Sequence, residues 1–125
     1  MLTDWGSFKK YWAPVLLYAG FIFYLSSIPA PLPAVKLDLS ALHVPMFFVL
    51  SYLMSRALAS TKLGSHGTIV FPMIVTALYG ILDELHQLYV PGRTFSYVDM
   101  GFDFLGASLV VFKNWWDKLF ERVNL

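Results

Sequence analysis

Apolar residues along the chain fall into four long blocks, each bounded by charged, proline-rich or glycine-rich stretches. The blocks cover residues 12–28, 39–58, 68–90 and 97–116. At ~1.5 Å per residue, a helix of this length can cross the ~30 Å hydrocarbon core of a bilayer, with some snorkelling at its ends. Backbone groups in lipid must be satisfied within their own segment, so the blocks should be helices. The pattern predicts an all-α membrane protein, a four-transmembrane-helix bundle forming one domain over residues 1–125.

The composition agrees with that pattern. Of the 125 residues, 58% are hydrophobic and 14% are charged, whereas an ordinary soluble domain carries about 25% charged residues. A net charge of +1 leaves no basic patch for phosphate backbones, so no nucleic-acid partner is expected. The chain has no cysteine, which excludes disulfides, cysteine-based metal sites and thiol catalysis.

The first block has a second interpretation, as a secretory signal. Lys9 and Lys10 precede it, and small residues and prolines at 29–34 follow it, which loosely imitates a cleavage site. However, the apolar run is longer than the usual signal core, and three prolines crowd the bond that would be cut. We therefore expect the segment to remain uncleaved as the first span.

The distribution of lysine and arginine predicts the orientation. The connections on one side would carry only Lys36 and Arg93. The other side would carry seven cations, Lys9, Lys10, Arg56, Lys62, Lys113, Lys118 and Arg122. Because cytoplasmic loops are enriched in these residues, we expect both termini in the cytoplasm and the chain in the cytoplasmic (inner) cell membrane. A short amphipathic C-terminal helix should lie along the inner interface, its apolar face formed by Trp116, Leu119, Phe120 and Val123.

Ionisable residues interrupt the third block near its outer end. At ~100° per residue, Asp83, Glu84, His86 and Gln87 fall within one arc of about 160° on a helix, and the leucines between them point the other way. A charge at membrane depth costs ~2.5–3.5 kcal/mol on insertion scales, and such residues usually face a site. One face of this helix must therefore meet polar partners.

The other blocks bring polar residues to the same level. These are Ser26, Ser27, His43, Asp99 and Asp103. Asp99 and Asp103 are four residues apart and therefore share a helical face. Gly80 and Gly106 are small enough to let helices approach closely there. We expect all of these groups to converge in one layer just below the extracytoplasmic surface.

Two interpretations of this layer remain. The polar groups could be structural, with a buried carboxylate pairing with Arg93 or His86 to fix the register of the helices, and His43 alone could simply donate to a carbonyl. Five carboxyl or imidazole groups on two adjacent helices exceed what register needs, and we favour a functional pocket.

A motif in the third block resembles the signature of VanZ-like membrane proteins. Residues 79–93 read Y-G-x-x-D-E-x-H-Q-x-x-x-P-G-R, and Asp99 follows. The Ser-Ser-Ile-Pro run at 26–29, then Asp38 and His43, match the earlier landmarks, and the Leu-Gly pair at 105–106 matches the later one. Asp103 departs from the family pattern, which prefers Asn, and adds a charge to the pocket.

The resemblance implies a bacterial or archaeal protein of the cytoplasmic membrane with a role in the cell envelope. The family takes its name from a link to resistance against teicoplanin-type glycopeptide antibiotics, which act at the outer face of the membrane. That face is also where the charge distribution places the polar layer.

The first hypothesis for function is binding of a lipid head group or cell-wall intermediate in the outer pocket. Its partners would be membrane lipids, a lipid-linked cell-wall intermediate or a glycopeptide. Arg93 would hold an anionic group, with Gln87 and His86 as neutral donors. The expected ligand-binding residues are Asp38, His43, Asp83, Glu84, His86, Gln87, Arg93, Asp99 and Asp103.

The alternative is an intramembrane enzyme, metal-assisted or not, acting on a lipid-linked substrate. Its candidate catalytic residues would act as general acid, general base or metal ligands: Asp83, Glu84, His86 and Asp99, with Asp103 beside them. The spacing Asp-Glu-x-His is not an established metal motif, so the sequence assigns neither a metal nor a cofactor. A proton or ion pathway ranks last, because the inner halves of the four blocks are nearly free of polar residues.

Overall fold

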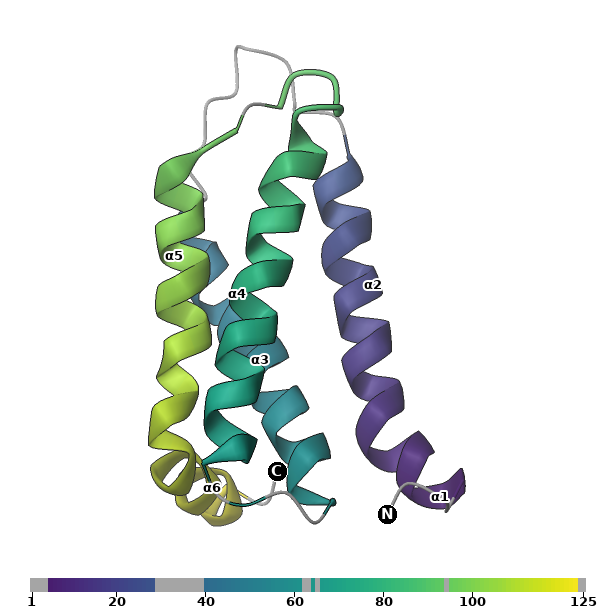
Figure 1. The fold of residues 1–125 in the computed structure, drawn as a ribbon, viewed down its shortest axis with the longest axis vertical. Helices are drawn as coiled ribbons and strands as arrows, with labels where there is room; N and C mark the ends of the chain where they lie inside the picture. The colour runs from purple at the N-terminus through teal and green to yellow at the C-terminus, as the bar shows by residue number, and fades with distance from the viewer. Residues whose placement is uncertain (1–4, 29–39, 62–63, 65, 94, 124–125) are drawn as a thin grey trace.

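The computed structural model describes residues 5–28, 40–61, 64, 66–93 and 95–123, and every regular element among them is helical. The all-α class predicted from the sequence is confirmed for this part of the chain. Four long helices run side by side along the molecule (Figure 1). They are α2 (Ala13–Ser27), α3 (His43–Ala59), α4 (Gly67–Gln87) and α5 (Tyr97–Ser108). Shorter elements complete the set: α1 (Trp5–Ser7), the π-helix η1 (Phe8–Trp12), the 3₁₀ turns η2 (Ser40–Leu42) and η3 (Leu109–Phe112), and α6 (Lys113–Arg122).

Local sequence explains where several helices begin. A proline in the first turn of α2 has no N–H to leave unsatisfied, and its φ suits a helix start. Ser96 caps α5, because its side chain accepts a hydrogen bond from the backbone N–H of Asp99 at 3.1 Å. Gly92, with φ 76°, supplies the left-handed residue that turns the chain after α4.

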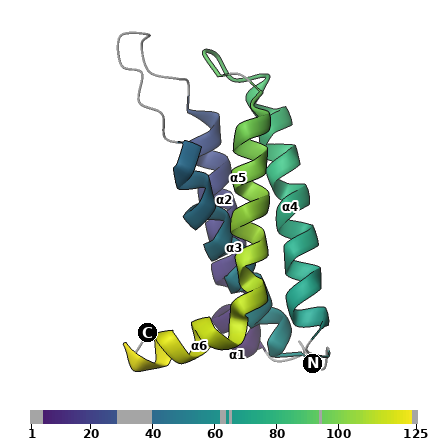
Figure 2. The ribbon, with the colours of Figure 1, turned by 90° about the vertical axis from the view of Figure 1, so that its left-hand side faces the viewer.

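The fourth helix ends earlier than predicted. The sequence suggested a helix over 97–116, but α5 gives way to η3 at Leu109, and the chain then turns into α6, which lies across the end of the bundle (Figure 2). The Trp116 indole donates to the Leu109 carbonyl at 3.0 Å and so satisfies one carbonyl left free at this bend. Tyr52 donates to Asp117 at 2.6 Å and holds α6 against α3. The turn therefore falls at Phe112, before the tryptophan pair.

Polar side chains are concentrated inside the bundle. The buried polar residues are Ser26, Ser51, Ser55, Thr68, Thr76, Asp83, Glu84, Gln87 and Asp103. Serines among them bond directly to backbone carbonyls of neighbouring helices: Ser51 donates to the Ala107 carbonyl at 3.0 Å, and Ser55 donates to the Thr68 carbonyl at 2.5 Å. Large apolar side chains lie on the outside, including Leu17, Phe21, Phe71, Ile74, Leu78, Leu82, Val98 and Leu105. This is the reverse of the usual arrangement in a soluble domain.

Two glycines permit the closest helix contacts. A Cβ on Gly106 of α5 would collide with the Val44 carbonyl oxygen of α3 and lie 3.0 Å from the Phe48 nitrogen. A Cβ on Gly80 of α4 would lie 2.9 Å from the Cβ of Asp103. Small residues thus bring α3, α4 and α5 together near the polar layer, as in many membrane bundles.

Among the described residues, one helix, Gly67–Gln87, is long and apolar enough by itself to cross a membrane. The segment His43–Ala59 is apolar but shorter. The remaining long helices are shortened by the π-helical start before α2 and by the bend after α5.

Candidate functional site

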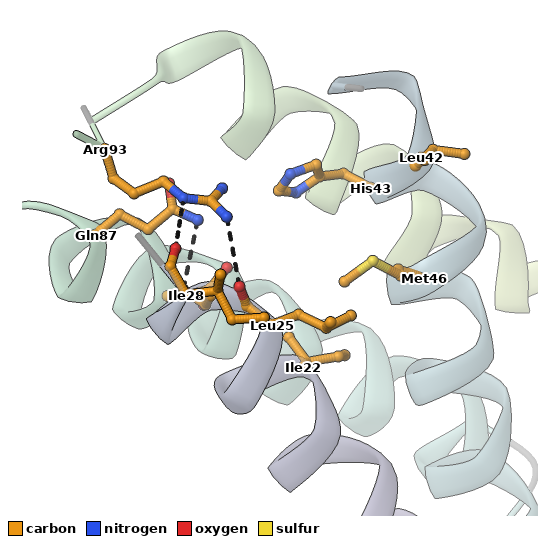
Figure 3. Close-up of a pocket in the computed structure, with 10 residues that line it drawn as sticks. Ile22, Leu25, Ile28, Leu42, His43, Met46, Gln87 and Arg93 are labelled. Carbon is orange, nitrogen blue, oxygen red and sulfur yellow. Dashed lines mark hydrogen bonds between the residues drawn. The ribbon is translucent and has the colours of Figure 1, made fainter. Parts of the chain in front are cut away.

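A pocket opens at the end of the bundle where α2 and α4 end and α3 and α5 begin, which we call the Arg93 end. Its volume is about 260 Å³. Figure 3 shows the lining residues, which come from α2, the start of α3, the end of α4 and the turn after it. The apolar wall is formed by Ile22, Leu25, Ile28, Leu42 and Met46. The polar side chains are Ser26, His43, Asp83, Gln87 and Arg93. One pocket therefore combines an apolar wall with both acidic and basic groups.

The polar arc of α4 is divided among three neighbours. His86 turns to α2, where its Nε2 lies 2.9 Å from the Ser27 hydroxyl and its ring stacks on Phe23 at 4.5 Å. Asp83 and Gln87, four residues apart, face the pocket, and the Gln87 amide donates to the Ser26 hydroxyl at 3.4 Å. The polar side chains of α4 contact different neighbours because their arc of about 160° is wider than the face that a single neighbouring helix covers.

Glu84 lies at the edge of the arc nearest to α5. It accepts a hydrogen bond from the Ser96 backbone N–H at 3.0 Å, and its side chain is fully buried. Its other carboxylate oxygen, Oε1, is buried with no hydrogen-bond partner among the described residues. An unpaired carboxylate oxygen at this depth is costly and requires a compensating group.

Arg93 reaches over the mouth of the pocket from the turn after α4 (Figure 3). Its Nε donates to the Ile28 carbonyl at 3.1 Å and its Nη2 to the Leu25 carbonyl at 3.5 Å. These bonds cap carbonyls at the end of α2 and hold the guanidinium in place. Within the part of the chain that the structure describes, no carboxylate lies within ion-pair distance of Arg93. The positive charge is thus held in place without a direct ion pair to any described carboxylate, and Asp83 is the acidic residue that shares the pocket with it.

His43 joins the pocket to a second group of residues. Its Nδ1 lies 2.7 Å from Asp103 Oδ1, and its Nε2 lies 3.7 Å from Asp99 Oδ2. Glu84 belongs to the same group, because one ligand atom each from His43, Glu84 and Asp99 lies within 4.8 Å of the others. We call Glu84, Asp99 and Asp103 the carboxylate cluster. His43 therefore lines the pocket on one side and faces the cluster on the other.

The residues chosen from the sequence do not form a single site. Asp83, Gln87, Arg93 and His43 line the pocket, while Glu84, Asp99 and Asp103 form the cluster behind His43. His86 belongs to neither group, because its side chain contacts Ser27 and Phe23 of α2. Asp38 lies outside the described residues.

Sequence reasoning missed Ser96 and the apolar wall. The spacing of Ser96 and Asp99 is that of a capping box at the start of an apolar run, and it could have identified the serine. Ser96 then emerges as the residue whose backbone N–H holds Glu84. Nothing in the local pattern distinguishes Ile22 or Met46 from other apolar helix residues, because their role depends on how α2 and α3 are rotated.

These features define a helical bundle with an apolar exterior, a polar interior and an anionic and cationic site at one end. The chain belongs to the VanZ/LLP1 family, whose family model matches residues 7–115. This match confirms the resemblance found in the motif at 79–93. No curated protein and no solved structure matches the chain.

Proposed function

We propose that the chain is a multi-pass protein of the cytoplasmic membrane and that its pocket binds the head group of an envelope lipid or lipid-linked cell-wall intermediate. The four spans would be α2, α3, α4 and α5, with both termini in the cytoplasm. The ligand class is a phosphate-bearing, hydroxylated head group. The pocket at the Arg93 end is the observation that carries the proposal.

The inverted distribution of side chains supports the membrane assignment. Leu17 is 75% exposed and Leu82 63% exposed, while Asp103 and Glu84 are fully buried. In water this arrangement would expose apolar surface and desolvate charge, and both are unfavourable. In lipid, apolar side chains face acyl chains without penalty, and serine and threonine can join helices by hydrogen bonds.

The distribution of cations supports the orientation. In Figure 1, α1 and α6 lie at the end of the bundle opposite to the Arg93 end. Lys9, Lys10, Lys113, Lys118 and Arg122 belong to η1 and α6 at that opposite end. The positive-inside rule then assigns the Arg93 end to the outer face.

The chemistry of the pocket suggests the ligand. Arg93 offers a fixed guanidinium with no acidic partner among the described residues, which suits a phosphate. Gln87 offers an amide for hydrogen bonds, and Asp83 is an acceptor for a hydroxyl of glycerol or sugar. A cavity of about 260 Å³ is small beside typical ligand pockets of ~300–1,000 Å³. It accommodates a head group, so the acyl or prenyl chains would lie along the apolar exterior.

Native mass spectrometry in detergent tests this proposal. The probes are dioleoyl phosphatidylglycerol, dioleoyl phosphatidylcholine and soluble glycerol 3-phosphate. We expect one phosphatidylglycerol per chain to bind in preference to phosphatidylcholine, which lacks head-group hydroxyls. Arg93→Lys keeps the charge but loses the planar fork, and it should weaken this binding by about 10-fold or more.

Arg56→Lys is the matched control, because Arg56 lies at the opposite end, over the Tyr11 ring. It should leave phosphatidylglycerol binding unchanged. Equal binding of both lipids, or equal losses in the two variants, would contradict the proposed pocket. Binding of glycerol 3-phosphate as tight as that of the lipid would assign the site to a free phosphate ester instead of a membrane lipid.

A further inference from the structure

We propose that His43, Glu84 and Asp99 form a binding site for a divalent transition-metal ion, with Asp103 holding His43 in position. This site lies behind the pocket, and its test does not depend on lipid binding. The proposal rests on four observations: the proximity of the ligand atoms, the orientation of His43, the unpaired buried oxygens and the charge of the cluster.

The proximity of the ligand atoms is the first observation. One donor atom from each of His43, Glu84 and Asp99 lies within 4.8 Å of the other two. Ligand atoms at ~2.0–2.2 Å from one metal are about 3.0–3.6 Å apart in tetrahedral or right-angled positions, so pairs of these atoms need to close by about 1–2 Å at most. The three residues come from α3, α4 and α5, so the bundle itself assembles the set.

The orientation of His43 is the second observation. Its Nδ1 lies 2.7 Å from Asp103 Oδ1, and because an ionised carboxylate only accepts, the form of His43 that pairs with it carries a proton on Nδ1. In the neutral imidazole the lone pair is then on Nε2, the nitrogen that lies 3.7 Å from Asp99 Oδ2. A histidine that donates from one nitrogen to a carboxylate while the other binds a metal is a recurrent arrangement in metal sites. Asp103 is accordingly a positioning residue.

The third observation is a set of carboxylate oxygens that are buried without hydrogen-bond partners. Among the described residues these include Glu84 Oε1, Asp99 Oδ1 and Asp103 Oδ2. Glu84 and Asp103 are fully buried, so bulk water does not reach them. Buried polar atoms are almost always paired, so the unpaired oxygens of Glu84 and Asp99, two of the three proposed ligands, are available to bind a cation.

The charge of the cluster is the fourth observation. Glu84, Asp99 and Asp103 bring three carboxylates together, and in the described part of the chain only His43 contacts any of them as a potential cation. Arg93 is held by the carbonyls of α2. A divalent ion would balance most of this charge inside a bundle where isolated carboxylates are expensive. One imidazole with carboxylates suits Mn²⁺ or Zn²⁺ better than Mg²⁺, which favours an all-oxygen shell.

Mn²⁺ titration of the purified full chain, followed by electron paramagnetic resonance, tests the site, because free Mn²⁺ gives a six-line signal that weakens on binding. We expect one Mn²⁺ per chain, displaced by Zn²⁺, which binds such ligands more tightly. His43→Ala and Glu84→Gln should each weaken binding by about 10-fold or more. Asp103→Asn should weaken it by about 10–100-fold without removing a ligand, as expected for a positioning carboxylate.

Asp117→Asn is the matched control, because it removes a partly buried carboxylate at the other end of the bundle, where Asp117 pairs with Lys113. It should leave Mn²⁺ affinity unchanged. If a cluster variant fails to fold, the wild-type titration still decides: no saturable Mn²⁺ or Zn²⁺ binding would overturn the proposal. It would also be overturned if Glu84→Gln and Asp117→Asn bound the metal equally well.

Discussion

A single methyl group on Gly106 should separate α3 from α5 and weaken the whole Arg93 end. The Cβ of Gly106→Ala would collide with the Val44 carbonyl oxygen and lie 3.0 Å from the Phe48 backbone nitrogen. Both obstacles are backbone atoms of a helix, so they cannot move aside as a flexible side chain would. The helices must part instead, and His43 would move away from Asp103.

The magnitude follows by comparison with Gly101, which lies on the same helix and where an added Cβ would have nothing within 4 Å. Gly→Ala raises helix propensity by up to ~1 kcal/mol at either position. Overpacking of a tight contact costs ~1–3 kcal/mol, and this cost applies only at Gly106. The gain in helix propensity is the same at both positions and cancels in the comparison. The free energy of unfolding of Gly106→Ala should therefore be about 1–3 kcal/mol lower than that of Gly101→Ala.

Thermal unfolding of both variants in the same detergent measures this difference. For a chain of this size, about 1–3 kcal/mol corresponds to a difference in Tm of about 3–15 °C. Mn²⁺ affinity should fall in Gly106→Ala and stay unchanged in Gly101→Ala, since only the first disturbs the contact between α3 and α5. Equal Tm values for the two alanine variants would refute the reasoning, because the collision would then be absent.

The topology, the pocket and the terminal helix can each be tested separately. Tyr89→Cys at the Arg93 end and Gly64→Cys at the other end should be labelled by an impermeant thiol reagent from opposite sides of the membrane, and labelling of both from outside would contradict the four-span orientation. Asp83→Asn and Arg93→Lys should abolish any effect of the protein on susceptibility to teicoplanin-type antibiotics while the amount of protein in the membrane stays unchanged. The control is Leu85→Ala, because Leu85 is exposed. If both pocket variants kept the full effect on susceptibility, the pocket would have only a structural role. Tyr52→Phe removes the 2.6 Å hydrogen bond to Asp117, which is worth about 1 kcal/mol, and it should speed amide hydrogen exchange in α6 but not in α4. The control is Tyr97→Phe, because Tyr97 is exposed. Unchanged exchange in α6 would show that the aromatic contacts alone hold this helix.

Much of the fold could be predicted from the sequence because apolar blocks and their dividers determine helices locally. The blocks at 39–58 and 68–90 differ from α3 and α4 by only a few residues at their ends. The helix predicted over 97–116 was wrong at its end. Residues 109–112 are as apolar as those before them, so the hydrophobic pattern showed no break where α5 ends. The bend at Phe112 depends instead on tertiary bonds from Trp116 and Tyr52.

The candidate site was predictable only as a set of residues. Helical periodicity placed Asp83, Glu84, His86 and Gln87 on one side of α4, and three of them are buried. Periodicity alone could not predict that His86 contacts Ser27 of α2, or that Glu84 accepts a hydrogen bond from the Ser96 backbone N–H. Those partners depend on the rotation and separation of neighbouring helices. The close contacts at Gly80 and Gly106 set the separation of α3, α4 and α5.

The most direct test of the central claim measures the distance between Arg93 and the phosphorus of a bound head group. Solid-state NMR on arginine-¹⁵N-labelled protein, reconstituted with phosphatidylglycerol in a phosphorus-free glycolipid bilayer, detects ¹⁵N–³¹P dipolar coupling at contact distance. We predict a coupling that disappears in Arg93→Lys and persists in Arg56→Lys. A wild-type protein with no such coupling, or one whose coupling survives in Arg93→Lys, would contradict the claim that this pocket binds a phosphate-bearing lipid.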